Sequence, residues 1–117
     1  MIRRSGAAGL VLALVTGQAA AVTMTNDMDL VYARYQMAIR AAIMCRGVTA
    51  DDAVWRKWSG YIDARTNHEL GAGERLSVIE GAKSDVTYMV RRQGGCGSDG
   101  IADLLVLYDA ELAPLVK

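Results

Sequence analysis

Apolar residues recur at helical spacing in four segments of the chain beyond residue 26, and glycines separate these segments. The first predicted helix spans residues 27–46, with Thr25 or Asn26 as its N-cap and Gly47 just past its end. The apolar stripe along this segment consists of Met28, Val31, Tyr32, Tyr35, Ile39 and Ala42. A polar stripe, which we expect to face solvent, consists of Asp29, Gln36 and Arg40.

The second predicted helix has the clearest start in the chain. The hydroxyl of Thr49 is placed to accept the backbone N–H of Asp52, as in a capping box. An apolar stripe follows at Val54, Trp55, Trp58, Tyr61 and Ile62. We expect this helix to end before Gly71 and Gly73, and its last turn to fray around Asn67.

The third predicted helix spans residues 74–93. Its inward-facing positions are Leu76, Ile79, Ala82, Val86, Met89 and Val90. Residues 86–90 would also suit a short strand, because valine, threonine and tyrosine favour β-structure. Arg91 and Arg92 suit the negative end of a helix dipole, so we predict a helix throughout.

The fourth predicted helix begins after the glycine-rich break at residues 94–97, with Ser98 or Asp99 as its N-cap. Its buried stripe consists of Ile101, Leu104, Leu105, Tyr108 and Leu112. Pro114 discourages continuation, because proline lacks a backbone N–H and its ring collides with the preceding turn. Together the four segments predict an all-α fold, a small up-down four-helix bundle.

Two cysteines occupy corresponding ends of this predicted bundle. Cys45 closes the first helix, and Cys96 lies in the break before the fourth. Short connections make neighbouring helices antiparallel, so both positions fall at the same end and a disulfide is geometrically natural. An even cysteine count also supports pairing in an oxidising compartment. Free thiols, a metal pair and a redox site are the alternatives, although the chain has no C-x-x-C motif.

The beginning of the chain has the pattern of a leader. Basic residues precede the apolar run at residues 7–15, and alanines follow where a signal peptidase would cleave, after Ala21 or alternatively after Ala19. We therefore predict a cleaved Sec-type signal peptide at residues 1–21 and a single helical domain at residues 22–117. The apolar run is far shorter than the about 20 residues that span a bilayer, so no stable membrane anchor is expected. The predicted location is the bacterial periplasm or the cell exterior.

The composition fits one small folded domain. With 117 residues, 52% of them hydrophobic and 22% charged, the chain is too short for a multidomain enzyme and too apolar for disorder. Its 13 basic residues balance its 13 acidic residues, so no basic excess indicates a nucleic-acid partner. Because the leader carries only basic charges, its removal leaves a mildly acidic mature chain.

Two short motifs suggest chemistry that their context does not support. His68 and Glu69 begin like the zinc-protease motif H-E-x-x-H, but position 72 is alanine and the chain has no second histidine. Residues 95–100 match G-x-G-x-x-G, but the dinucleotide-binding motif needs a preceding strand and a longer βαβ unit. We therefore expect no metal site, no cofactor, no catalytic residues and no enzymatic activity.

The aromatic residues of the second predicted helix have two interpretations. Trp55, Trp58 and Tyr61 either pack in the core or form an interaction face, to which Arg91 and Arg92 would contribute. We expect a non-enzymatic protein that acts by protein–protein interaction, as an inhibitor, immunity factor, chaperone or accessory subunit. The expected partner is another periplasmic or envelope protein. The alternative is a small-ligand or metal-binding module, which the methionines and the glycine-rich break suggest.

Overall fold

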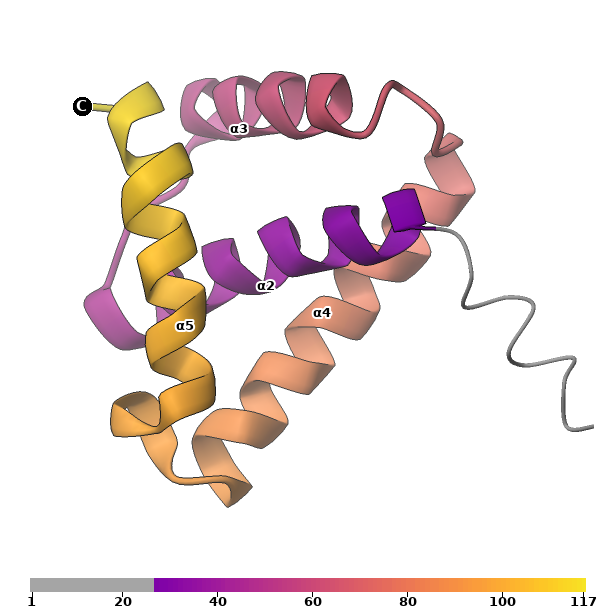
Figure 1. The fold of residues 1–117 in the computed structure, drawn as a ribbon. Coiled ribbons are helices and arrows are strands. Elements are labelled where there is room, and N and C mark those ends of the chain that lie inside the picture. The colour runs from indigo at the N-terminus through magenta and orange to yellow at the C-terminus, as the bar shows by residue number, and fades with distance from the viewer. Residues whose placement is uncertain (1–26) are drawn as a thin grey trace, which may run out of the picture.

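The computed structural model describes residues 27–117, which form an all-α domain of four helices (Figure 1). These helices are α2 (Asp27–Arg46), α3 (Asp52–Arg65), α4 (Ala72–Arg92) and α5 (Asp99–Leu107). After α5 the chain continues through a π-helical turn, η3 (Tyr108–Leu112), and a 3-10 turn, η4 (Ala113–Leu115). None of the four helices is long and apolar enough to cross a bilayer. The predicted leader and the predicted N-cap at Thr25 or Asn26 lie outside the described residues.

Helix α2 lies at the centre of the domain, and the other three helices are arranged around it (Figure 1). It packs most extensively against α4 and next against α5. In Figure 1, α3 and the C-terminal end of α4 lie on opposite sides of α2, while α5 passes the C-terminal end of α2. The chain reverses direction at each of the three connections between helices, so α2 and α4 run the same way. The core therefore forms around α2.

The central position of α2 explains why it is buried on more than one side. Ala38, Ala41 and Ala42 are fully buried, and their small side chains let neighbouring helices approach closely. Gln36 is only 4% exposed, so the solvent-facing stripe predicted through this residue is wrong there. A helix covered by partners on several sides buries positions that an amphipathic pattern assigns to solvent. Arg40, from the same predicted stripe, is half-buried.

The helix starts are set by local side-chain caps. At α3 the carboxylate of Asp51 accepts the backbone N–H of Val54 at 2.9 Å, so the prediction that Thr49 caps this helix is wrong. The helix begins at Asp52, three residues after Thr49, and the first free N–H groups therefore point at Asp51. At α5 the hydroxyl of Ser98 accepts the N–H of Ile101 at 3.4 Å, which confirms one of the two predicted caps.

The end of the chain departs from a regular α-helix just before Pro114. This proline lies in η4, where its missing N–H breaks the α-helical hydrogen-bond pattern, and the preceding turn η3 widens to a π-helix. The carbonyl oxygen of Leu112 instead accepts a hydrogen bond from the indole Nε1 of Trp58 at 3.1 Å. This hydrogen bond joins the C-terminal turns of the chain to α3.

Trp58 is the largest fully buried side chain, with an exposed fraction of 0%. Its ring makes edge-to-face contacts with Trp55, at 5.4 Å between ring centroids, and with Tyr108, at 5.9 Å. The other large, fully buried apolar side chains are Ile39, Ile62, Val86, Ile101 and Leu112. They come from all four helices and from η3, so each element contributes to one core.

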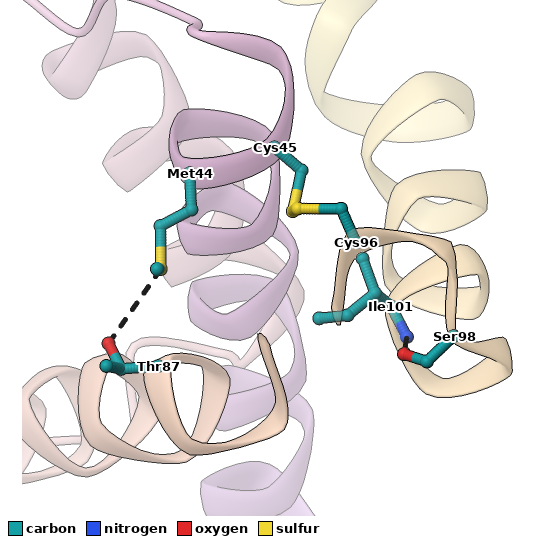
Figure 2. Close-up of a disulfide and its surroundings, with 6 residues drawn as sticks. All are labelled: Met44, Cys45, Thr87, Cys96, Ser98 and Ile101. Atoms are coloured by element: carbon teal, nitrogen blue, oxygen red, sulfur yellow. Dashed lines mark hydrogen bonds between the residues drawn. A yellow bond between two sulfur atoms is a disulfide. The ribbon is translucent and has the colours of Figure 1, made fainter. Parts of the chain in front are cut away.

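Cys45 and Cys96 form the predicted disulfide (Figure 2). Their Cα atoms are 5.7 Å apart, which is usual for a disulfide, and the two residues are separated by 51 positions in the chain. The bond joins the last turn of α2 to the 3-10 turn η2 (Gly95–Gly97), directly before α5. The pairing rules out free thiols and a metal pair at these two residues.

Glycines shape the turn that carries Cys96. Gly94 has a φ angle of 103°, a conformation that residues with a side chain rarely adopt. At Gly100, in the first turn of α5, an added Cβ would lie 2.7 Å from the Cε of Met89 on α4. Within the G-x-G-x-x-G segment, Gly95 also has a positive φ angle, of 75°, and Gly100 lies close to α4, so these two glycines serve the turn and the helix contact. The element before this segment is helix α4, and the structure shows no strand between residues 27 and 117.

Candidate functional site

The structure brings three elements together around the carboxylate of Glu111 in η3. Its Oε1 accepts a hydrogen bond from the hydroxyl of Tyr35 on α2 at 2.5 Å. The same oxygen accepts a second hydrogen bond from the hydroxyl of Tyr61 on α3 at 2.6 Å. The two tyrosine rings meet edge to face at 6.0 Å between centroids. We call Glu111, Tyr35, Tyr61 and the nearby Arg65 the Glu111 cluster.

Arg65 completes this cluster from the end of α3. Its Nη2 lies 3.6 Å from the Oε1 of Glu111, and its guanidinium carbon lies 5.8 Å from the centre of the Tyr61 ring. The cation therefore faces both a carboxylate and the electron-rich face of an aromatic ring. Because more than half of the Arg65 side chain is exposed, water weakens both attractions.

The contacts of the Glu111 cluster stabilise the ionised carboxylate. The hydrogen bonds from Tyr35 and Tyr61 lower the pKa of Glu111, and the charge of Arg65 acts in the same direction against partial burial. Burial and the hydrogen bond to Glu111 raise the pKa of Tyr35 to about 12. The hydrogen bond to Glu111, followed by burial, also raises the pKa of Tyr61. A carboxylate held ionised by two neutral hydroxyls is a poor proton acceptor, so the cluster is suited to joining helices rather than to acid–base catalysis.

We expect Glu111→Gln to destabilise the protein by about 1 kcal/mol at neutral pH, because the amide loses the charge that strengthens both hydrogen bonds. The folded-state pKa of Glu111 lies below its ordinary value of 4.5. The stabilisation from the ionised group is therefore present above pH 4.5 and is lost as the pH falls through the lowered pKa. Urea unfolding of the wild-type protein and of Glu111→Gln over a series of pH values measures the difference between their free energies of unfolding.

Glu80→Gln is the matched control for this experiment. Glu80 is an exposed glutamate on α4 whose only ion pair among residues 27–117 is a 3.4 Å contact with Lys83 one helical turn away. We expect Glu80→Gln to change the free energy of unfolding by only a few tenths of a kcal/mol at any pH. If the difference in free energy of unfolding between the wild type and Glu111→Gln does not become smaller in acid, the assigned role of the carboxylate is contradicted.

The outer face of α4 carries a shallow hollow of about 420 Å³. We call it the α4 face, and its lining residues are Lys83, Ser84, Thr87, Tyr88, Arg91 and Arg92. Tyr88 is 58% exposed there, so most of its ring is accessible to a contacting molecule. The hollow therefore combines an exposed aromatic ring with three cations. Thr87, at its inner edge, lies against Met44 of α2, with 3.8 Å between Oγ1 and Sδ (Figure 2).

A second, smaller cavity of about 130 Å³ lies between α2, α3 and α4. We call it the Arg40 cavity, and it is lined by Gln36, Ile39, Arg40, Ile43, Trp55, Ile79 and Lys83. Four of these side chains are apolar and none is acidic. Lys83 lines both this cavity and the α4 face, so the two hollows adjoin along α4.

The residues proposed from the sequence as an interaction face have different environments. Trp58 is fully buried and belongs to the core. Tyr61 is half-buried and its hydroxyl is hydrogen-bonded to Glu111. Trp55 is half-buried where it lines the Arg40 cavity. Arg91 and Arg92 are exposed on the α4 face. Since α3 and the C-terminal end of α4 lie on opposite sides of α2 (Figure 1), the five residues do not share one surface.

His68 lies in the turn after α3, where it is exposed and has a φ angle of 56°. It precedes α4, which begins at Ala72, so His68 and Glu69 do not lie on a helix as the zinc-protease motif requires. Between residues 27 and 117, no group of three or more His, Cys, Asp and Glu side chains is placed to hold a metal ion.

The Glu111 cluster, the Arg40 cavity and the exposed ring of Tyr88 were not predicted from the sequence. Glu111 and Tyr35 are separated by 76 positions, and no local pattern connects them. The α4 face does have a sequence pattern, because Lys83, Thr87 and Arg91 follow one another at intervals of four, on one side of a helix.

Comparison with known proteins supplies no relative from which a role could be transferred. No family model matches the sequence, and neither the curated proteins nor the solved structures contain a match. What this protein does is therefore inferred from its own residues.

Proposed function

We propose that this chain is a small secreted or periplasmic protein that acts without catalysis, by binding another envelope protein through the α4 face. Inhibitor, immunity factor, chaperone and accessory subunit are the roles that fit such a mode of action. The partner surface is acidic and presents an apolar contact for Tyr88. The proposed location rests on the leader pattern at residues 1–21 and on the disulfide, which persists in oxidising compartments.

The observation that carries this proposal is the exposed ring of Tyr88 among three cations. Tyrosine and arginine are enriched at the residues that dominate binding energy in protein interfaces. Among the described residues, neither Arg91 nor Arg92 forms an ion pair, and Lys83 contacts only Glu80 at 3.4 Å. These charges are therefore available to a partner. Complementary charge raises the association rate and selects against partners of the wrong sign.

Reversing the two arginines should disrupt this interaction. We expect Arg91→Glu combined with Arg92→Glu to weaken binding of the partner by about tenfold or more, since attraction becomes repulsion at the contact. The measurement is crosslinking in the native compartment, followed by quantitative mass spectrometry of the proteins that co-purify.

Arg56→Glu combined with Lys57→Glu is the matched control. These neighbouring cations on α3 are also exposed but do not line the α4 face. The control reverses the same number of charges, so it accounts for the change in overall charge. Equal loss of the co-purifying protein in both double variants would contradict the proposed face, as would full retention in the α4 variant.

Binding of a small ligand is the second candidate function. The observation that favours it is the Arg40 cavity, in which polar and apolar groups converge in a partly enclosed space.

A further inference from the structure

The Arg40 cavity is built from regular positions on three helices. On α2, residues 36, 39, 40 and 43 follow helical spacing and face the same way. Ile79 and Lys83, one turn apart on α4, form the opposite wall, and Trp55 of α3 closes the cavity. Sites built on helices hold their lining groups more rigidly than sites built on loops. The shape of the Arg40 cavity is therefore determined by the packing of the core.

Arg40 is the unusual residue in this cavity. Its Nε is shielded from solvent and has no hydrogen-bond partner. Within residues 27–117, no carboxylate pairs with its guanidinium. Partial burial of a charge without a counterion is costly, and a native structure rarely keeps such a group without a reason. An anion in the cavity would supply the missing partner.

The remaining lining residues define what else the ligand contains. Ile39, Ile43, Ile79 and Trp55 offer apolar contacts, and Lys83 adds a second positive charge beside Arg40. The volume of about 130 Å³ is close to that of an engineered cavity of about 150 Å³ that holds benzene. The cavity therefore suits a compact group of a few carbon atoms and is too small for a nucleotide or a haem.

We propose that the Arg40 cavity binds a carboxylate that carries a short apolar chain. The carboxylate lies against the guanidinium of Arg40, with the ammonium of Lys83 nearby, and the chain packs between the isoleucines and Trp55. Two sources offer this chemistry: a free short-chain acid, and a glutamate side chain of a bound protein. The inference rests on the second candidate function, small-ligand binding in the Arg40 cavity, and names the chemistry of that ligand; it holds whether or not the α4 face binds a partner.

Titration with butyrate tests the proposal, and neutral butyramide is the matched probe. The indole N–H of Trp55 reports on the cavity in a ¹⁵N–¹H NMR spectrum, and the indole N–H of the buried Trp58 is the internal control. We expect butyrate to shift the Trp55 signal saturably in the millimolar range, and butyramide to bind about tenfold more weakly or not at all. The Trp58 signal should move little.

Arg40→Gln removes the charge and retains a polar side chain. We expect this variant to lose the preference for butyrate over butyramide. Arg34→Gln, on an exposed arginine of the same helix that does not line the cavity, should keep it. No saturable shift in the wild-type protein, equal binding of acid and amide, or an unchanged preference in Arg40→Gln would each overturn the proposal. The comparison of acid with amide needs no variant, so it decides the matter even if Arg40→Gln fails to fold.

Two peptides distinguish the sources of the carboxylate. Acetyl-Ala-Glu-Ala-amide carries the carboxylate on a glutamate side chain, and acetyl-Ala-Gln-Ala-amide is its neutral control. Tighter binding of the glutamate peptide than of butyrate assigns the cavity to a residue of a protein partner. Tighter binding of butyrate than of the glutamate peptide assigns the cavity to a free acid. If the glutamate peptide binds measurably and the glutamine peptide binds equally well, the role given to Arg40 is overturned.

Discussion

Replacing both Cys45 and Cys96 with serine should lower the free energy of unfolding by about 4 kcal/mol. The disulfide closes a loop of 51 positions, and in the chain-entropy model its loss restores that much freedom to the unfolded chain. It also joins the end of α2 to the turn before α5, so its removal loosens the attachment of α5 to the central helix. Small domains have total stabilities of only about 5–15 kcal/mol, so this is a large share.

Thermal unfolding with and without a reducing agent measures this effect. A loss of this size corresponds to a fall of roughly 15–30 °C in the melting temperature of a domain of this length. Reduction of the wild-type protein should reproduce the fall and should leave the double serine variant unchanged. If the double variant melts at the wild-type temperature under oxidising conditions, the disulfide does not stabilise the fold.

Replacing Trp58 with alanine should cost about 3–5 kcal/mol, because it removes the largest buried side chain and leaves a cavity in the core. The change also removes the ring contacts with Trp55 and Tyr108. In addition, the carbonyl oxygen of Leu112 loses its hydrogen bond from the indole. Since Trp58 fastens η3 to α3, we expect the C-terminal turns to unfold first, as amide hydrogen exchange would detect.

Two further substitutions separate the causes of this loss. Trp58→Phe keeps most of the apolar volume and removes the hydrogen bond to Leu112, so we expect a cost of about 1–3 kcal/mol. Trp55→Ala removes a half-buried ring and should cost less than Trp58→Ala. Urea unfolding of the three variants gives the order. A cost for Trp55→Ala as large as that for Trp58→Ala would show that Trp58 is not the central core residue.

The parts of the fold that depend on local chemistry could be predicted from the sequence. The first helix has the predicted bounds of residues 27–46, because Gly47 follows it with a φ angle of 66° and ends it. Residues 86–90 are helical, as predicted, although their composition also suits a strand. The disulfide could be predicted because helix order alone places Cys45 and Cys96 at the same end.

The parts that depend on tertiary contacts could not be predicted. Gln36 is buried because helices cover α2 on several sides, and a single helix pattern does not contain that information. The Glu111 cluster requires the π-helical turn η3, whose exact geometry depends on Pro114 and on the bond from Trp58 to Leu112. The Arg40 cavity requires side chains from three helices to meet. Each of these sites is defined by neighbours distant in sequence.

A photoreactive amino acid in place of Tyr88 would report which molecule lies against the α4 face in the native compartment. The same amino acid at Val106, which is 67% exposed on α5, is the control for random contacts. We expect one dominant crosslinked partner with an acidic surface at position 88, its loss when Arg91 and Arg92 are changed to glutamate, and no such product at position 106. The absence of a crosslink at position 88, or the same products at both positions, would contradict binding of a protein partner to the α4 face.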